Sequence, residues 1–141
     1  MIRKFTGNDM DAVLDIWLTA SIKAHDFIAP SFWESQVKNM RKVYIPASET
    51  HVYMQNARAI GFYALSGNTL AALFVAPEYQ GRGVGKALLA HAKTQREALT
   101  LSVYKENGAS CQFYLAHGFE VIREQTDAHT GHLEYIMSTG T

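Results

Sequence analysis

The chain has 141 residues, 48% of them hydrophobic, and its 13 Lys and Arg balance 13 Asp and Glu. This length fits one domain with a single core, so we expect one domain over residues 1–141. The zero net charge argues against a nucleic-acid partner, and the lack of a long apolar stretch argues against a membrane span. The single cysteine excludes an internal disulfide and favours a reducing, cytoplasmic setting.

The N-terminal part of the chain predicts one short strand and two helices. Residues 2–5 fit a strand. Apolar side chains recur at the helical period over residues 10–18, directly after an Asn and an Asp that can cap a helix. Ser31 and Glu34 have the spacing of a capping box, which predicts that a second helix begins at Ser31, and Pro46 is expected to end it.

Three successive strands follow, and the short turns between them predict an antiparallel meander. The strands are expected at His51–Gln55, Ala59–Ser66 and Thr69–Val75. A helix over about residues 83–97 and a strand at Leu99–Tyr104 come next. Because strand–helix–strand crossovers are right-handed and join parallel strands, Thr69–Val75 and Leu99–Tyr104 are expected to be parallel.

The C-terminal part predicts one helix and two closing strands. Asn107 is a good N-cap for this helix, and Gly118 is a good left-handed stop. The strands are expected at Phe119–Thr126 and Leu133–Ser138, on either side of a polar turn. The order of elements therefore predicts an α/β (α+β) fold, with a mixed sheet and helices on its faces.

A glycine-rich loop, QGRGVG, comes directly before the helix that begins near residue 83. It does not fit a P-loop, because Gln80 and Ala87 stand where glycine and Ser/Thr are required. It does not fit the dinucleotide fingerprint either, because Lys86 and Leu88 stand where the third glycine is required. Glycines still let backbone N–H groups converge on one point at a positive helix terminus, which predicts a pyrophosphate cradle. The alternative is a plain surface turn.

The residues around the loop carry a resemblance to a known family. The segment FVAPEYQGRGVG, residues 74–85, resembles the acyl-CoA signature of the GNAT superfamily of N-acetyltransferases. Downstream, VYKENGASCQFYLAHGFEV resembles the second half of that family's site, with an Asn that opens a helix and a Tyr seven residues later. The resemblance implies the GNAT fold: a mixed, mostly antiparallel sheet of about six to seven strands, one parallel pair splayed apart, and about four helices on its faces.

The resemblance also implies an activity. A GNAT enzyme of the small bacterial type moves an acetyl group from acetyl-CoA to a primary amine by direct attack in a ternary complex, without a metal. The acceptor stays open: a protein lysine or N-terminus, an amino acid, a polyamine and a drug are all compatible. Family members are monomers or homodimers. The alternative is a catalytically degenerate sensor or interaction module that binds coenzyme A (CoA).

The resemblance implies a set of CoA-binding residues. Backbone groups on the strand before the loop would pair with the pantetheine arm, and one N–H would face the thioester oxygen. The loop would hold the pyrophosphate, and the helix cap would contact the pantetheine. These residues are Leu73, Phe74, Val75, Gln80, Gly81, Arg82, Gly83, Val84, Gly85, Lys86, Asn107 and Tyr114.

Tyr114 matches the family's proton donor. A free phenol has a pKa of about 10, so it is protonated at neutral pH and is able to donate to the leaving thiolate. The alternative interpretation of Tyr114 is a core aromatic side chain on its helix.

The general base is less defined, because neither expected parallel strand carries an acid. Ser102 stands where one branch of the family has Glu, and it is a candidate for relaying water. His25 is a candidate base from the loop between the first two helices, as is its neighbour Asp26. The alternative role of His25 is a capping or solvated side chain. Four aromatic residues are candidates for the acceptor pocket or simply for the core: Trp17, Phe27, Trp33 and Tyr63.

Overall fold

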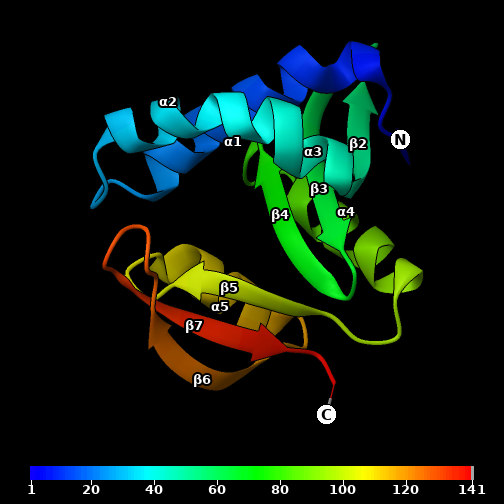
Figure 1. Ribbon diagram of the computed structural model, residues 1–141. Helices are drawn as coiled ribbons and strands as arrows, with labels where there is room; N and C mark the ends of the chain where they lie inside the picture. Colours follow the sequence, from blue (N-terminus) through cyan, green and yellow to red (C-terminus); the bar gives the residue numbers. More distant parts are fainter. Residues whose placement is uncertain (141) are drawn as a thin grey trace.

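A seven-stranded mixed sheet organises the computed structural model, which describes residues 1–140 (Figure 1). The strand order is β1-β2-β3-β4-β5-β7-β6. All neighbours are antiparallel except β4 and β5. The strands span β1 (Ile2–Lys4), β2 (Glu49–Gln55), β3 (Arg58–Ser66), β4 (Thr69–Val75), β5 (Thr100–Tyr104), β6 (Glu120–Thr126) and β7 (Leu133–Ser138).

Four longer helices cover the two faces of the sheet. The helices are α1 (Met10–Ala24), α2 (Pro30–Asn39), α4 (Val84–Gln95) and α5 (Gly108–Ala116). One core cluster joins α1 and α2 to β2 and β3 through residues such as Trp17 and Phe62. The other joins α4 and α5 to the opposite face through residues such as Leu88 and Leu101. The strand number, the mixed sheet and the helices confirm the expected fold class.

The parallel pair separates almost as soon as it forms. The β4–β5 register contains one pair, Thr69 with Thr100, at the start of both strands. Figure 1 shows the two halves of the sheet diverging beyond that point, with β2, β3 and β4 on one side and β5, β7 and β6 on the other. This splay confirms the expected separation, and it leaves the C-terminal part of β4 without a strand partner on one edge.

The second helix does not begin where the capping box predicted. It begins at Pro30, and its N-cap is Ala29, which has an extended backbone and no side-chain cap. Proline is well tolerated at the first helical position, and it forces the preceding residue out of the helical region. Proline geometry therefore determines this helix start, and the prediction of Ser31 as N-cap was wrong. A capping box is present instead at Thr6 and Asp9, before α1.

The end of this helical segment is also irregular. A π-helical turn, Met40–Tyr44, follows α2 and leads into the three-residue helix α3 (Ile45–Ala47). Pro46 therefore lies inside the last short helix rather than just after the helix. The wider π turn helps to accommodate Pro46, which lacks an N–H and crowds the carbonyl of the preceding turn.

Gly61 sets the distance between α4 and the sheet. It lies on β3 opposite Val75. A Cβ placed there would lie 3.0 Å from Leu88 Cδ1, 3.1 Å from the Phe74 carbonyl oxygen and 3.2 Å from Val84 Cγ1. Only glycine lets the first turns of α4 approach β3 so closely. The position of the glycine loop before α4 thus depends on a residue of the neighbouring strand.

Candidate functional site

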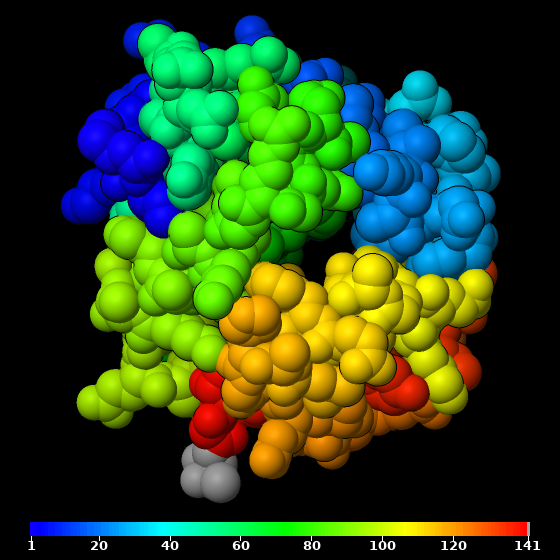
Figure 2. Space-filling model, turned by 180° about the vertical axis from the view of Figure 1, so that it is seen from behind, coloured from blue at the N-terminus to red at the C-terminus, as the bar shows by residue number. Residues whose placement is uncertain are grey.

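A cavity of about 690 Å³ lies where β4 and β5 separate. Figure 2 shows the molecule hollowed at its centre, between the green segment of β4, the blue segment of α1 and α2, and the yellow segment of β5 and α5. Most of the predicted CoA-binding residues line this cavity. They are Leu73, Phe74, Val75, Gln80, Gly81, Gly83, Gly85, Lys86 and Asn107.

The glycine loop has the geometry of an anion cradle. Gly81 and Gly83 have φ angles of 79° and 84°, in the left-handed region that disfavours other residues. Gly83 is the N-cap of α4, which begins at Val84. The free N–H groups of the first helical turn therefore border the cavity, at the positive end of the helix dipole.

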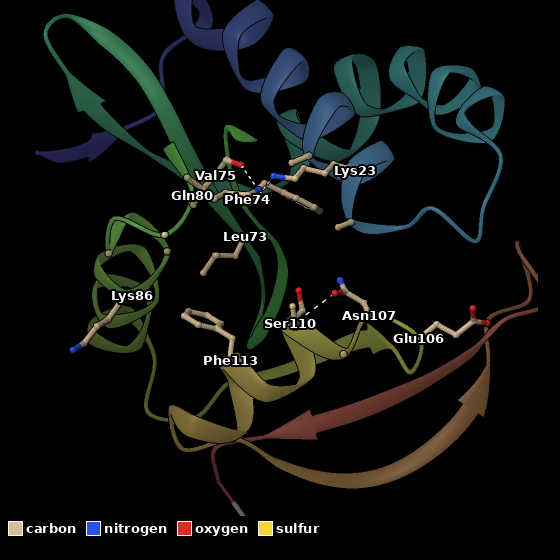
Figure 3. Close-up of a pocket in the computed structure, with 17 residues that line it drawn as sticks. Lys23, Leu73, Phe74, Val75, Gln80, Lys86, Glu106, Asn107, Ser110 and Phe113 are labelled. Carbon is tan, nitrogen blue, oxygen red and sulfur yellow. Dashed lines mark hydrogen bonds between the residues drawn. The ribbon is translucent and has the colours of Figure 1, made fainter. Parts of the chain in front are cut away.

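Gln80 connects the loop to the strand and to α1. Its Nε2 donates to the Val75 carbonyl oxygen at 3.1 Å, and its Oε1 accepts from Lys23 Nζ at 3.3 Å (Figure 3). Lys23 lines the cavity from α1 and brings a positive charge toward the loop. Lys23 was not predicted, because nothing in the sequence of α1 indicates which helix face meets the loop.

Two of the predicted loop residues lie outside the cavity lining. Arg82 is exposed and stacks over the Tyr79 ring, with its Cζ 5.4 Å from the ring centroid. Val84, the first residue of α4, is buried in the core against β3. Only the backbone of Val84 is therefore available for the predicted role. Figure 3 shows the Lys86 side chain extending away from the middle of the cavity.

A second cavity, of about 260 Å³, adjoins the first. Leu73, Phe74, Asn107 and Ser110 line both cavities, so the two meet at the open edge of β4. The second cavity lies on the side of α1 and α2, and it contains the three predicted catalytic residues. These are His25, Ser102 and Tyr114.

Tyr114 is both a core residue and a cavity residue. Its side chain is 9% exposed and packs edge-on against Phe119, yet it lines the second cavity. Burial raises the pKa of its phenol above the ordinary value. The phenol is therefore fully protonated at neutral pH. The two interpretations from the sequence, proton donor and core aromatic, are compatible in this geometry.

His25 is buried and bonded to Asn107. Asn107 Oδ1 accepts from the Ser110 backbone N–H at 3.3 Å, so its Nδ2 faces His25 Nε2, also at 3.3 Å, and donates to it. The His25 ring stacks on Trp33 with centroids 5.0 Å apart. Burial lowers the pKa of His25, which keeps the ring neutral. The lone pair that a base would use is thus engaged by the Asn107 amide.

Ser102 and Tyr104 project from β5 on the cavity side. Ser102 is exposed and lines the second cavity, and Tyr104 lines it two residues further along the strand. The Tyr104 hydroxyl donates to the Asp127 carboxylate in the turn between β6 and β7. This hydrogen bond therefore connects the β6–β7 turn to the wall of the second cavity.

The aromatic candidates divide into three groups. Trp17 and Trp33 line the second cavity. Phe27 does not line it, but its ring packs edge-on against Tyr104 with centroids 5.7 Å apart. Tyr63 is fully buried on the α4 side of the sheet, where its hydroxyl and His91 Nδ1 are 2.6 Å apart. Of the two interpretations of Tyr63, the core one holds, because the alternation of β3 directs its side chain to the face opposite the second cavity.

Glu134 was missed by the sequence analysis. It lines the second cavity from β7, and it is the only carboxylate to do so within residues 1–140. Predicting it requires the register that places Glu134 opposite Tyr104, and that register joins segments about thirty residues apart.

No group of three or more His, Cys, Asp or Glu side chains in the described chain is arranged to hold a metal ion. No helix there is both long and apolar enough to cross a membrane.

Comparisons with known proteins agree with this geometry. The family model described as "Acetyltransferase (GNAT) domain" matches residues 46–121. The chain is 32% identical over 139 residues to peptidyl-lysine N-acetyltransferase YiaC of Escherichia coli (strain K12), which covers 98% of this chain and 95% of YiaC. It is 28% identical over 121 residues to peptidyl-lysine N-acetyltransferase YjaB of Salmonella typhimurium, covering 85% of this chain and 83% of the relative.

Solved structures have the same fold. The solution structure of apo-form YjaB from Escherichia coli aligns with a TM-score of 0.86 and 25% identity, over 99% of this chain and 96% of that chain. A crystal structure of PaiA N-acetyltransferase from Thermoplasma acidophilum in complex with coenzyme A aligns with a TM-score of 0.84 and 22% identity, over 100% and 98% of the two chains. At that identity the PaiA likeness concerns the fold alone.

Proposed function

The chain belongs to the GNAT family of acetyl-CoA-dependent N-acetyltransferases, and we propose that its acceptor is the side-chain amine of a lysine residue in a protein. The named relatives YiaC and YjaB are peptidyl-lysine N-acetyltransferases, which supports this acceptor. Acetyl-CoA is the acyl donor, and the acceptor amine is the second substrate.

The observation that carries the proposal is the size and position of the second cavity. Its volume of about 260 Å³ is below the range of about 300–1,000 Å³ typical of sites for drug-sized ligands. It has aromatic walls and joins the larger cavity at the edge of β4. Such a slot suits one unbranched side chain that reaches inward from a large partner, rather than a bulky small molecule.

The larger cavity is proposed to hold CoA. The loop amides from Gly81 to Lys86 bind the pyrophosphate, with Lys23 as an additional cation. The unpaired edge of β4 at Leu73 to Val75 takes the pantetheine arm as a strand would. Asn107 lines both cavities, so it is placed to contact the pantetheine near the thioester.

The proposed reaction is a direct transfer. The neutral acceptor amine attacks the thioester carbonyl carbon, and a backbone N–H of β4 stabilises the resulting oxyanion. The carbon–sulfur bond then breaks as the amide forms. Tyr114 gives its phenol proton to the leaving thiolate, the one proton released by the amine passes to solvent, and solvent returns one proton to the tyrosine.

Ser102 is our proposed route for the proton that leaves the amine. Its hydroxyl is exposed in the second cavity, where it can hold a water molecule beside the acceptor. His25 is less suited to accept that proton directly, because Asn107 engages its Nε2. We propose that His25 positions Asn107, and a role as base would require that hydrogen bond to break.

A second candidate function rests on one observation. No acid is present on β4 or β5, where a direct general base would be expected. A degenerate protein that binds CoA as a sensor or interaction module would have the same cradle and no turnover.

One experiment separates the two functions. Purified protein is incubated with acetyl-CoA and a lysine-containing protein or peptide, and thiol release is followed together with the peptide mass. The proposal requires acetylation at lysine and none on the same peptide with Lys replaced by Arg. CoA binding by calorimetry without acetylation of any amine tested would favour the sensor. The cytoplasmic setting and a monomer or homodimer stay predictions from the sequence.

A further inference from the structure

Glu134 lines the second cavity from β7. On β7 it pairs with Tyr104 of β5, and neighbouring residues in register project to the same face of a sheet. Its side chain therefore shares the face of Tyr104 and Ser102. All three residues line the cavity.

The carboxylate of Glu134 is held in place by the edge strand. Gln125 Nε2 donates to Glu134 Oε1 at 2.7 Å, and Arg123 Nε donates to Gln125 Oε1 at 3.3 Å. Because Arg123 can only donate, it fixes the Gln125 amide with its NH₂ group toward Glu134. One carboxylate oxygen is thus oriented by a hydrogen-bonded chain along β6.

The charge of Glu134 has no protein counterion. Within residues 1–140 no Lys, Arg or His forms an ion pair with it, whereas Glu106 pairs with His132 and Glu124 with Lys105. Its negative charge also contributes to raising the pKa of Tyr104, after burial and the Asp127 hydrogen bond. The charge therefore acts inside the cavity and is available to a ligand.

Two side chains in the wall of this cavity carry a buried nitrogen atom without a hydrogen-bond partner. Trp33 is 8% exposed and His25 is 7% exposed, and both line the cavity. Neither Trp33 Nε1 nor His25 Nδ1 has a hydrogen-bond partner. An unsatisfied buried donor is costly. A cavity wall that holds a carboxylate and aromatic side chains suits a ligand with an apolar stem and a cationic end, as a lysine side chain has.

We propose that Glu134 is the specificity-determining residue for the acceptor: it binds the protonated amine in the second cavity and selects a cationic, unbranched side chain. This inference rests on the proposed function, because it concerns the second substrate of the same reaction. Gln125 is a positioning residue, which acts by orienting the carboxylate.

The test compares Glu134→Gln with Glu124→Gln. Glutamine keeps the shape of Glu134 and removes its charge, and Glu124 is a matched control on β6 whose partner is Lys105 outside the cavity. With saturating acetyl-CoA, Glu134→Gln raises KM for a single-lysine peptide about tenfold, with kcat within about threefold and KM for acetyl-CoA unchanged. Gln125→Leu produces a smaller rise in the same KM.

Salt provides a second readout that a purely structural role would not change. Raising the ionic strength weakens binding of the peptide to the wild-type protein because it screens the ion pair. Peptide binding to Glu134→Gln loses most of that dependence. Thermal melting of each variant checks that the fold is retained.

Peptide binding to the CoA-bound protein is also measured by calorimetry, so the inference is tested even without turnover. Binding that depends on Glu134 without acetylation supports the inference and contradicts the proposed function. Acetylation with an unchanged KM in Glu134→Gln contradicts the inference and leaves the proposed function intact. A fall in kcat alone also overturns it, because recognition of the ground-state cation must appear in KM.

Discussion

Replacing Gly61 with Ala tests how the sheet positions the CoA cradle. The added methyl group would lie 3.0 Å from Leu88 Cδ1, 3.1 Å from the Phe74 carbonyl oxygen and 3.2 Å from Val84 Cγ1. The two side-chain carbons can move by a few tenths of an ångström. The carbonyl oxygen cannot move without shifting β4. Strain is therefore expected at the contact between β3, β4 and α4.

The magnitude follows from two opposing terms. Overpacking in a dense core costs about 1–3 kcal/mol, and replacing glycine by alanine recovers about 0.4–1 kcal/mol through the unfolded chain. The free energy of unfolding should thus fall by about 1–2 kcal/mol. For a domain of this size that lowers Tm by about 3–8 °C.

The assay is thermal unfolding together with calorimetric titration of CoA. Gly7→Ala is the control, because nothing lies within 4 Å of the Cβ it would add and Gly7 has no positive φ. Gly61→Ala should melt lower than the control and bind CoA more weakly, since the start of α4 is displaced. If Gly61→Ala melts at or above the control, the close approach of α4 does not depend on this glycine, and the reasoning is refuted.

Three further predictions concern the site and the core. Tyr114→Phe should lower kcat about 10²- to 10⁴-fold with little change in CoA affinity, and full turnover in a steady-state assay would remove Tyr114 as the acid. Gly83→Val should abolish CoA binding in calorimetry because valine disfavours a φ of 84°, and unchanged affinity would contradict the cradle. The pKa of His51 is lowered, chiefly by burial. Near pH 6.5 the unfolded chain therefore binds a proton at His51 that the folded protein does not bind, so the free energy of unfolding should fall as the pH drops through that value. His51→Gln should reduce the acid loss of Tm, and an identical pH slope would refute that assignment.

The fold was largely predictable because its signals are local. The positions of β3 and β4 follow from apolar segments bounded by tight turns, and the structure has them at Arg58–Ser66 and Thr69–Val75. The start of α2 was not predicted, because two local rules competed there. The capping pattern at Ser31 favoured one start, and Pro30 imposed another.

The two cavities differ in how far sequence predicts them. Much of the CoA side comes from the continuous segment around the glycine loop, so a motif describes that part, whereas Lys23 and Asn107 join it from elsewhere in the chain. The acceptor side combines residues of α1, α2, β5 and β7. Its carboxylate, that of Glu134, lines the cavity because β7 pairs with β5 in the register that places Glu134 opposite Tyr104. Alternation in β7 assigns Glu134 to one of two faces, but it cannot indicate which strand lies beside it. Register depends on the assembled sheet.

The distance of Glu134 from the β4–β5 gap has a chemical consequence. A carboxylate beside an ammonium group raises the pKa of the amine. A carboxylate next to the thioester carbon would therefore oppose the deprotonation that the attack of the amine requires. Glu134 lies on β7, one strand beyond β5 and about 4.8 Å further from the gap. Ser102 lies on β5 itself, nearer the shared edge of the two cavities. The acceptor can therefore be recognised as a cation at β7 and lose its proton only after it has moved inward to β5, which separates selection from chemistry along one short path.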